Sequence, residues 1–301
     1  MPTNFRSAPK NHLPSSTLVL RAPALAEIPW LVHGFSTRLG GVSAIPDSKT
    51  SRAELNLGTV NWDSPANVAE NRRRFLDCLR AERMHTFLQE QIHSDLIRAV
   101  DETPAHSRRL RGDGMITSRA GLLLAILAAD CLPVLVVDVR QRVVAALHCG
   151  WRGTVHRIAQ KGVGRMRQLY GSRPADLRAA IGPGIRACCY RVGEEVAAEF
   201  ECQFLYSASL LVIQKPQKKF VDKKYALMQS ERWRGTPSHD GRMIHLDLVE
   251  ANVRQLQEAG VDRSQIYSDA PCTSCHPELF FSHRRDAGRT GRMMGVIGIR
   301  R

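Results

Sequence analysis

The chain has 301 residues, of which 43% are apolar, and 43 Lys and Arg against 29 Asp and Glu give it a net charge of +14. The apolar content is enough for a large buried core. The eight cysteines are too sparse for a disulfide scaffold, and they indicate reduced thiols in a cytoplasmic protein. The positive charge favours nucleic acid, phosphate or acidic substrates as partners, but it is no evidence about the fold.

The N-terminal end and the rest of the chain differ in character. Residues 1–16 are polar and contain prolines, which predicts a loose arm. The only early apolar run, residues 18–20, is far too short for a signal peptide. Motifs are scattered from end to end over the remainder, so we expect one large α/β domain that covers residues 17–301.

The first elements that the sequence predicts are a strand, a glycine turn and a helix. Residues 30–37 alternate well enough for a strand, and the turn at 38–43 contains paired glycines that allow close backbone approach. Arg38 beside such a turn could hold an anion, although by composition alone a surface arginine is the simpler interpretation. A helix is predicted from Ser64 to about Arg80, because Ser64 or the preceding aspartate can cap it and proline suits its first position.

Reactive side chains follow three predicted strands in the middle of the chain. His93 follows a strand over residues 87–92, Cys131 follows the apolar run 122–128, and His148 follows the run 143–147. A membrane-spanning helix over 121–153 is disfavoured, because Asp130 near its centre costs about 2.5 to 3.5 kcal/mol and a proline breaks the helix three residues later. Short apolar runs with breakers between them fit buried strands.

Two kinds of site are compatible with these three side chains. Two imidazoles and one thiolate are a reasonable zinc set that leaves a fourth position for water or substrate. Alternatively, Cys131 and His148 form a nucleophilic pair with Asp130 or Asp113 as the orienting carboxylate. The spacing in the sequence does not separate the two. Copper oxidase chemistry is disfavoured, because no two of the eleven histidines stand in an HxH arrangement.

The second half of the chain alternates helices and strands. Residues 204–240 contain a basic run and turn formers, and we interpret them as an insertion with a solvated basic face. The remaining predictions are a helix at 154–170 with an apolar face that includes Leu169, a strand at 177–181, a helix at 193–200, a helix at 246–259, and strands at 266–269 and 294–299.

Cysteines and arginines form further clusters in this half. Cys272 and Cys275 are half of a structural zinc site with no second pair at the expected spacing, so we treat them as structural or incidental, and Cys188 and Cys189 as packing residues. A histidine and four arginines lie within residues 283–292, and arginine forks suit phosphate or carboxylate oxygens. No motif for nucleic-acid binding accompanies them, so no nucleic-acid partner is predicted.

Seven motifs occur in order along the chain. They are TRLGGVS (37–43), QIHSD (91–95), DGMIT (113–117), AADCLPV (128–134), HCGWRGT (148–154), IGPGI (181–185) and FFSHRRDAGRTGRM (280–293). As a set they resemble the laccase-domain family, also called the polyphenol oxidase-like or peptidoglycan editing factor family. The resemblance spans residues 30–300. Two departures are Cys149, where the family usually has alanine and which would add a thiol beside the metal, and the stretch 204–240, which matches no motif.

This resemblance implies a single-domain layered α/β/β/α fold with mixed sheets. It also implies a catalytic zinc site whose ligands are His93, Cys131 and His148. The implied activity is phosphorolysis of the purine nucleosides adenosine, inosine and S-methyl-5'-thioadenosine, with adenosine deamination as a second activity. Its partners would be these nucleosides and phosphate, with no membrane; the sequence makes no prediction of the oligomeric state.

Roles for other residues follow from residue type and motif position. Arg38, Arg152 and Arg289 are candidates for holding phosphate or ribose oxygens, and Asp113 or Asp130 for carrying protons. An alternative, suggested by the family's other name, is an amidase that edits peptidoglycan precursors with Cys131 or zinc-bound hydroxide. A copper polyphenol oxidase is disfavoured by the missing HxH motifs, and a non-catalytic nucleic-acid binder is the third option.

Overall fold

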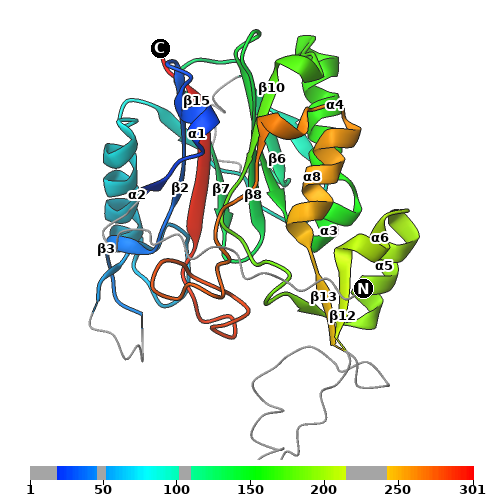
Figure 1. Cartoon of the computed structure of the whole chain (residues 1–301). Coiled ribbons are helices and arrows are strands. Elements are labelled where there is room, and N and C mark those ends of the chain that lie inside the picture. The colour runs from blue at the N-terminus through cyan, green and yellow to red at the C-terminus, as the bar shows by residue number, and fades with distance from the viewer. Residues whose placement is uncertain (1–18, 46–51, 102–109, 215–242) are drawn as a thin grey trace, which may run out of the picture.

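Two mixed β-sheets pack face to face at the centre of the computed structural model, and helices cover the outer face of each (Figure 1). The structure describes residues 19–45, 52–101, 110–214 and 243–301. The four layers follow the order α/β/β/α, as the family resemblance implies. The predicted arm at 1–16 lies outside the described residues. None of the described helices is long and apolar enough to cross a membrane.

The first sheet has five strands in the order β1-β2-β15-β7-β4. Their bounds are Val19–Leu20, Leu31–Ser36, Met293–Ile299, Leu122–Ala128 and His85–Phe87. The last strand of the chain, β15, lies between β2 and β7 and is antiparallel to both, whereas β4 is parallel to β7. The C-terminal strand therefore holds the two halves of this sheet together.

The second sheet has six strands in the order β14-β10-β8-β9-β6-β5. Their bounds are Ile266–Tyr267, Leu177–Ile181, Leu132–Asp138, Val143–Cys149, Gly114–Thr117 and Ile97–Ala99. The pairs β10–β14 and β5–β6 are parallel and the others are antiparallel. The apolar run predicted at 143–147 lies in β9 of this sheet.

Alternation along the strands explains the layers. In β7, Leu122 and Leu124 face the other sheet, while Leu123 packs under helix α2 (Pro65–Leu79). In β9, Val144 faces the first sheet and Leu147 faces the helices on the opposite side. Because both faces of these strands are buried, their sequences are apolar throughout instead of alternating with polar residues.

Helices on the outer face of the second sheet close its core. They are α3 (Trp151–Val155), α4 (Ile158–Tyr170) and α8 (Leu248–Glu258), with α5 (Glu194–Gln203) and α6 (Ser207–Leu210) beside them. On the first sheet, α2 begins at the predicted cap, where the side chain of Ser64 accepts a hydrogen bond from the backbone N–H of Asn67 at 3.1 Å. A four-residue helix, α1 (Pro23–Ala26), precedes β2.

A third, small sheet contains part of the predicted insertion. Its order is β11-β13-β12, with bounds Arg191–Val192, Met243–Leu246 and Leu211–Gln214. Residues 204–214 therefore belong to the folded body, because α6 and β12 lie within them. The basic run at 215–219 and the turn formers up to 241 lie outside the described residues. Two 3-10 turns, Pro174–Asp176 and Arg263–Gln265, precede β10 and β14.

Three local predictions are wrong for identifiable reasons. The strand predicted at 87–92 ends at Phe87, because the side-chain amide of Gln91 takes over pairing with β7: it donates to the Leu127 carbonyl and accepts from the Leu127 N–H, both at 2.8 Å. The turn at 38–43 contains the strand β3 (Leu39–Ser43), although Gly41 is needed for close approach, since a Cβ there would lie 2.0 Å from the Glu54 carbonyl oxygen.

The third correction concerns the helix predicted at 154–170. It consists of two helices, α3 and α4, separated by Arg157 in the left-handed conformation at φ 60°. Because of this break in the helix, α3 packs against β9 while α4 packs across β9, β6 and β5 of the second sheet. Leu169, expected on the buried face, is 42% exposed. Gly171 at φ 67° ends α4 as predicted.

A candidate metal centre at one end of the sheets

His93, Cys131 and His148 converge although they come from three separate segments. His93 follows β4, Cys131 lies in the turn between β7 and β8, and His148 is in β9. Their ligand atoms all lie within 4.8 Å of one another. The two imidazole rings meet edge to face with centroids 5.1 Å apart. One metal ion can therefore contact all three side chains.

Asp113 holds this arrangement from behind. Its carboxylate is fully buried and accepts five hydrogen bonds. Three come from the consecutive backbone N–H groups of residues 92–94, one from the Ser94 hydroxyl, and one from Nδ1 of His148 at 2.8 Å. Asp113 thus fixes the loop that carries His93 and leaves Nε2 of His148 directed at the metal position, which is the usual role of a carboxylate behind a metal-binding histidine.

The backbone is bent at the site. His93 has φ 58° and Asp130 has φ 98°, a region that residues other than glycine adopt at a cost of about 1 to 3 kcal/mol. Asp130 is held there by hydrogen bonds from the Thr273 hydroxyl at 2.6 Å and the Arg284 N–H at 2.7 Å. Asp113 anchors His93 in the same way. These contacts stabilise the conformations that aim His93 and Cys131 at each other.

Three titratable side chains are coupled at the site. Burial by itself raises the pKa of Cys131, but the charge of His148 and hydrogen bonds from both histidines lower it to about 6. Burial lowers the pKa of His148, but the thiolate of Cys131 and the carboxylate of Asp113 raise it to about 9. Burial likewise opposes ionisation of Asp113, yet hydrogen bonds from His148 and Ser94 hold its pKa at about 2. Cys131 is thus a thiolate, the form that binds metal ions, at neutral pH.

The thiolate state of Cys131 can be tested in metal-free protein. We expect alkylation of Cys131 by iodoacetamide to reach half its maximal rate near pH 6, compared with about pH 8.5 for an ordinary thiol. In His148→Ala the midpoint is expected to move towards the ordinary value, because the positive charge is lost. Mass spectrometry resolves the eight cysteines. A midpoint near pH 8.5 in the wild-type protein would contradict the ion pair.

Cys149 does not add a thiol to the site, contrary to the expectation from the sequence. It is next to His148 in β9, so its side chain points to the opposite face of the sheet. There it is fully buried in the core under the helices, and burial raises its pKa well above the usual range. Glycine at the following position leaves room for the thiol, since a Cβ on Gly150 would lie 3.0 Å from the Cys131 sulfur.

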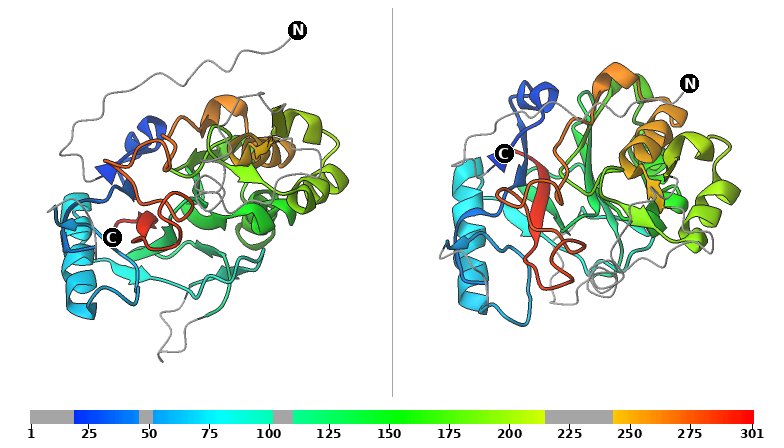
Figure 2. Two further views of the ribbon diagram at one scale, coloured as in Figure 1. Left: turned by 90° about the horizontal axis from the view of Figure 1, so that it is seen from below. Right: turned by 60° about the horizontal axis from the view of Figure 1, so that its bottom comes forward.

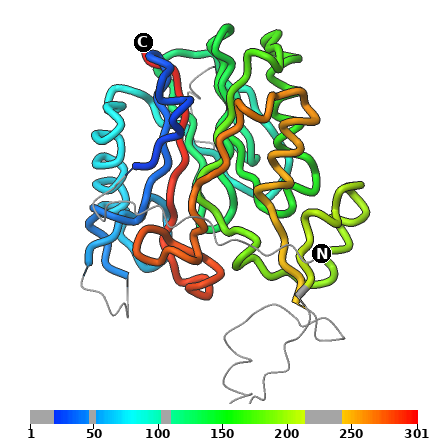
Figure 3. The backbone as a smooth tube through the Cα atoms, in the orientation of Figure 1, coloured from blue at the N-terminus to red at the C-terminus, as the bar shows by residue number. Residues whose placement is uncertain are grey.

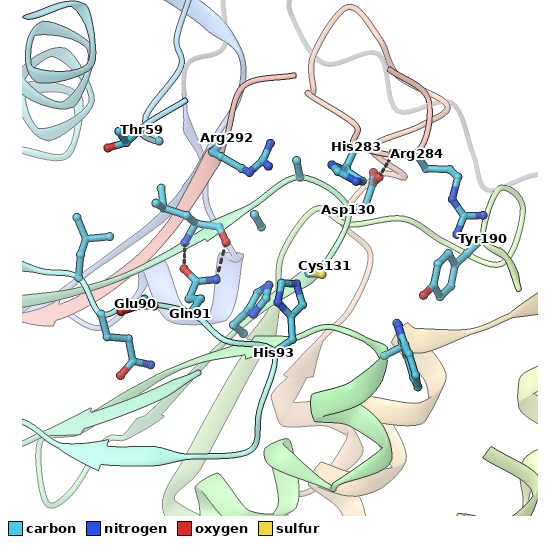
Figure 4. A pocket seen from close by; sticks show the side chains of 18 of the residues that line it. Thr59, Glu90, Gln91, His93, Asp130, Cys131, Tyr190, His283, Arg284 and Arg292 are labelled. Atoms are coloured by element: carbon cyan, nitrogen blue, oxygen red, sulfur yellow. Dashed lines mark hydrogen bonds between the residues drawn. The ribbon is translucent and has the colours of Figure 1, made fainter. Parts of the chain in front are cut away.

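The metal centre lies in the wall of a pocket of about 580 Å³, a size typical of small-molecule sites. Figure 4 shows Cys131 and His93 with His283, Arg284 and Arg292 above them and Tyr190 to one side. Trp151 and Tyr190 supply aromatic surface, and the arginines supply positive charge. The guanidinium of Arg284 also lies 5.2 Å from the ring centre of Tyr190. The pocket combines apolar faces with groups that bind anions.

The arginines predicted from the motifs lie elsewhere. Among the described residues that line the pocket, Arg38, Arg152 and Arg289 do not occur. Arg38 forms a two-point ion pair with the buried Glu54 at 2.7 and 2.9 Å, and Arg152 lies over the ring of Trp151. Arg289 is exposed. The arginines that line the pocket are Arg72, Arg284 and Arg292, of which the sequence analysis noted the last two only as part of a basic cluster.

A second group of side chains was missed. Cys188, Cys189, Cys272 and Cys275 lie within 4.8 Å of one another, although the sequence suggested packing for the first pair and an incidental role for the second. The signal that could have joined them is topological. Each pair follows a strand of the second sheet, β10 or β14, and these strands are parallel neighbours whose ends meet at one edge.

Comparison with known proteins places the chain among recognised relatives. The purine nucleoside phosphorylase of Deinococcus radiodurans is 38% identical over 284 residues, which cover 94% of this chain and 93% of that protein. The purine nucleoside phosphorylase YlmD of Geobacillus stearothermophilus is 36% identical over 280 residues, which cover 89% and 90% of the two chains. These names state the activity of the two relatives, not that of this chain.

Solved structures give the same result. The crystal structure of YlmD from Geobacillus stearothermophilus matches with a TM-score of 0.73 at 35% identity, covering 95% of this chain and 97% of that one. The YfiH protein of Bacillus licheniformis matches with a TM-score of 0.74 at 32% identity, covering 91% and 94%. A family model described as multi-copper polyphenol oxidoreductase laccase matches residues 32–300. The chain therefore belongs to the multi-copper polyphenol oxidoreductase laccase family.

Proposed function

We propose that this protein is a zinc-dependent purine nucleoside phosphorylase that acts on adenosine, inosine and S-methyl-5'-thioadenosine, with adenosine deamination as a second activity of the same site. The observation that carries this proposal is the position of His93, Cys131 and His148 in the wall of a basic pocket. The names of the relatives, purine nucleoside phosphorylase, support the same reaction class.

Zinc fits the donor set better than a copper cluster does. Two imidazoles and a thiolate are common zinc ligands, and three protein ligands leave one position for a reactant. In the described residues, the two groups of side chains close enough to hold a metal ion contain two histidines in total. An imidazole-rich copper cluster of the kind that the family's name refers to has too few ligands here.

When bound, zinc supplies Lewis-acid activation of an oxygen nucleophile. The chain itself supplies the orientation. Asp113 keeps the proton of His148 on Nδ1, so that Nε2 is the ligand atom. Gly150 leaves the space in which the Cys131 sulfur lies, and the Asp130 carboxylate fixes the turn before it. Each ligand is therefore held before a substrate arrives, which is what a rapid reaction requires.

The pocket residues provide for both halves of the nucleoside reaction. Trp151 and Tyr190 offer aromatic faces for the purine, and burial raises the pKa of Tyr190 above its usual range, so its hydroxyl stays protonated. Arg284 and Arg292 offer guanidinium forks for phosphate oxygens. In phosphorolysis a phosphate oxygen bonds to the anomeric carbon, the glycosidic bond breaks, and the purine leaves with the bonding electrons and gains a proton.

The test is conversion of adenosine with and without phosphate by protein of measured metal content. About one zinc per chain at the His93 site and adenine release that depends on phosphate are expected for phosphorolysis. Inosine formed without phosphate reports the deaminase activity. Zinc-loaded protein that converts neither adenosine nor the other two nucleosides would overturn the proposal. Chromatographic separation of adenine, inosine and hypoxanthine gives all of these results in one assay.

Arg292 is expected to bind phosphate. The aliphatic part of its side chain packs on Gly58, where a Cβ would lie 2.6 Å from the Arg292 Cγ. The absence of a side chain at Gly58 therefore leaves the space through which Arg292 reaches the pocket. Arg292→Met keeps the stem and removes the charge, and we expect KM for phosphate to rise about 10- to 100-fold, the loss of one charge-assisted hydrogen bond. Arg289→Met, in the same loop but exposed, is the matched control. If the KM for phosphate rises in Arg289→Met and not in Arg292→Met, then Arg289 is the residue that binds phosphate.

The same side chains also resemble a cysteine hydrolase triad, and this supports a second candidate function. Cys131 with a lowered pKa, His148 beside it and Asp113 on the far nitrogen form that order of groups. An amidase acting on peptidoglycan precursors would use Cys131 as the nucleophile. It predicts turnover of amide substrates by protein stripped of zinc, whereas the phosphorylase predicts none.

A further inference from the structure

Two cysteine pairs meet at a second position in the structure, away from His93 and His148. Cys188 and Cys189 follow strand β10 and its glycine-proline-glycine turn, while Cys272 and Cys275 follow the neighbouring parallel strand β14. The two segments are joined by backbone pairing, since the Thr273 N–H donates to the Gly184 carbonyl at 3.0 Å. Figures 2 and 3 show the segment between β14 and β15 looped across the ends of the two sheets.

The four sulfur atoms form a compact group. All lie within 4.8 Å of one another, and Cys275 is 3.4 Å from Cys188 and 3.3 Å from Cys189. A tetrahedral zinc ion with zinc–sulfur bonds of about 2.3 Å places its sulfur ligands about 3.8 Å apart. The two short distances lie a little below this value and every other sulfur–sulfur distance is at most 4.8 Å, so an ion fits with small side-chain rotations.

The surroundings of the sulfurs also suit metal binding. Cys272 is buried, and the backbone N–H groups of Arg186 and Cys275 lie near its sulfur. Such N–H groups orient a thiolate and stabilise its negative charge. All four cysteines are free. The sulfurs are not arranged as two separate disulfide pairs, since Cys275 lies 3.4 Å from Cys188 and 3.3 Å from Cys189.

We propose that Cys188, Cys189, Cys272 and Cys275 form a second zinc site, a structural one with four thiolate ligands. Four protein ligands close the coordination shell and leave no position for a substrate, which is typical of structural zinc. Soft thiolates in tetrahedral arrangement select zinc or iron–sulfur chemistry over harder ions. Nothing in the phosphorylase reaction requires this site, so the inference stands apart from the proposed function.

The site ties together two segments that form the pocket wall. Cys189 is followed directly by Tyr190, which lines the pocket. Cys272 is followed by Thr273, whose hydroxyl donates to Asp130 at 2.6 Å, next to the ligand Cys131. Arg285 also donates to the Thr273 carbonyl, at 2.9 Å. Zinc bound to the four cysteines would therefore hold Tyr190 and Asp130 in place from outside the pocket.

The experiment counts zinc in purified full-length protein and variants by elemental analysis. We expect about two zinc ions per chain in the wild type and about one in Cys275→Ser and in His148→Ala, since each variant removes one of two independent sites. Cys202→Ser, an exposed cysteine in α5, is the matched control and keeps the wild-type count. A second readout rests on the proposed function: in Cys275→Ser the KM for adenosine is expected to rise with little change in kcat, because Tyr190 loses its anchor.

A measurement on the wild type alone guards against a variant that does not fold. A mercurial reagent that titrates thiols, combined with a zinc-binding dye, should release zinc in two steps, and cobalt-substituted protein should show the strong sulfur charge-transfer absorption of a four-thiolate site. Wild-type protein with a single zinc that Cys275→Ser retains would overturn the proposal. So would iron in place of zinc, or an intact mass lower by about 2 Da for each disulfide formed.

Discussion

Replacing Cys131 or His148 with alanine is expected to lower kcat/KM for adenosine by about 10³-fold or more and to remove one zinc ion per chain. Lewis-acid activation contributes several kcal/mol to a transition state, and about 4 kcal/mol corresponds to a thousandfold in rate. Cys131→Ala also leaves His148 without the charge that raises its pKa to about 9. Phosphorolysis and deamination should fall together, because the proposed function assigns both to one site.

The adjacent cysteine provides the control for this prediction. Cys149→Ala changes the neighbouring residue of β9, but its sulfur lies in the core on the other face of the sheet. We expect this variant to keep its zinc and most of its activity. Elemental analysis and the adenosine assay on the three variants check the result. Full turnover by Cys131→Ala or His148→Ala would refute the assignment of the site.

The central strands could be predicted because they are buried on both faces, whereas the layered α/β/β/α arrangement is implied only by the family resemblance. The apolar runs within residues 121–153, such as 122–128 and 143–147, are short and lie between breakers, which favours buried strands. The apolar pattern does not predict where a strand ends when a side chain takes the place of backbone pairing. Gln91 completes the edge of β7 with its amide group, so an apolar, strand-like sequence at 87–92 ends its strand at Phe87.

The convergence of His93, Cys131 and His148 could be predicted, and the arginines of the pocket could not. A single histidine at a strand end is usually structural, but two imidazoles and a thiol that each follow an apolar run form a recognisable set of metal ligands. An arginine serves equally well in an ion pair, over an aromatic ring or in a pocket, and only tertiary contacts distinguish Arg38, paired with Glu54, from Arg292 in the pocket. The cysteine cluster was missed because its two pairs are separated in sequence and meet through the parallel strands β10 and β14.

Asp113 is the residue outside the ligand set whose replacement should have the largest effect. Its two oxygens accept five hydrogen bonds, and each of the five partners is a donor. Asparagine has the same shape but only one oxygen. Whichever way its amide lies, the NH₂ group faces donors, either at His148 and His93 or at Ser94 and Ile92. The substitution is therefore not conservative at this position.

Asp113→Asn is accordingly expected to weaken zinc binding by about 10- to 100-fold, as loss of a carboxylate behind a metal-binding histidine does, and to lower the free energy of unfolding by about 3 kcal/mol. Ser94→Ala is the matched control, since it removes one of the five hydrogen bonds, to the Asp113 carboxylate at 2.8 Å, and leaves the carboxylate intact. Its cost should be about 1 kcal/mol. Chelator competition measures the zinc affinity and urea unfolding measures the stability. If Asp113→Asn binds zinc as tightly as Ser94→Ala, then Asp113 does not set the tautomer of His148, and the site is held by its three ligands alone.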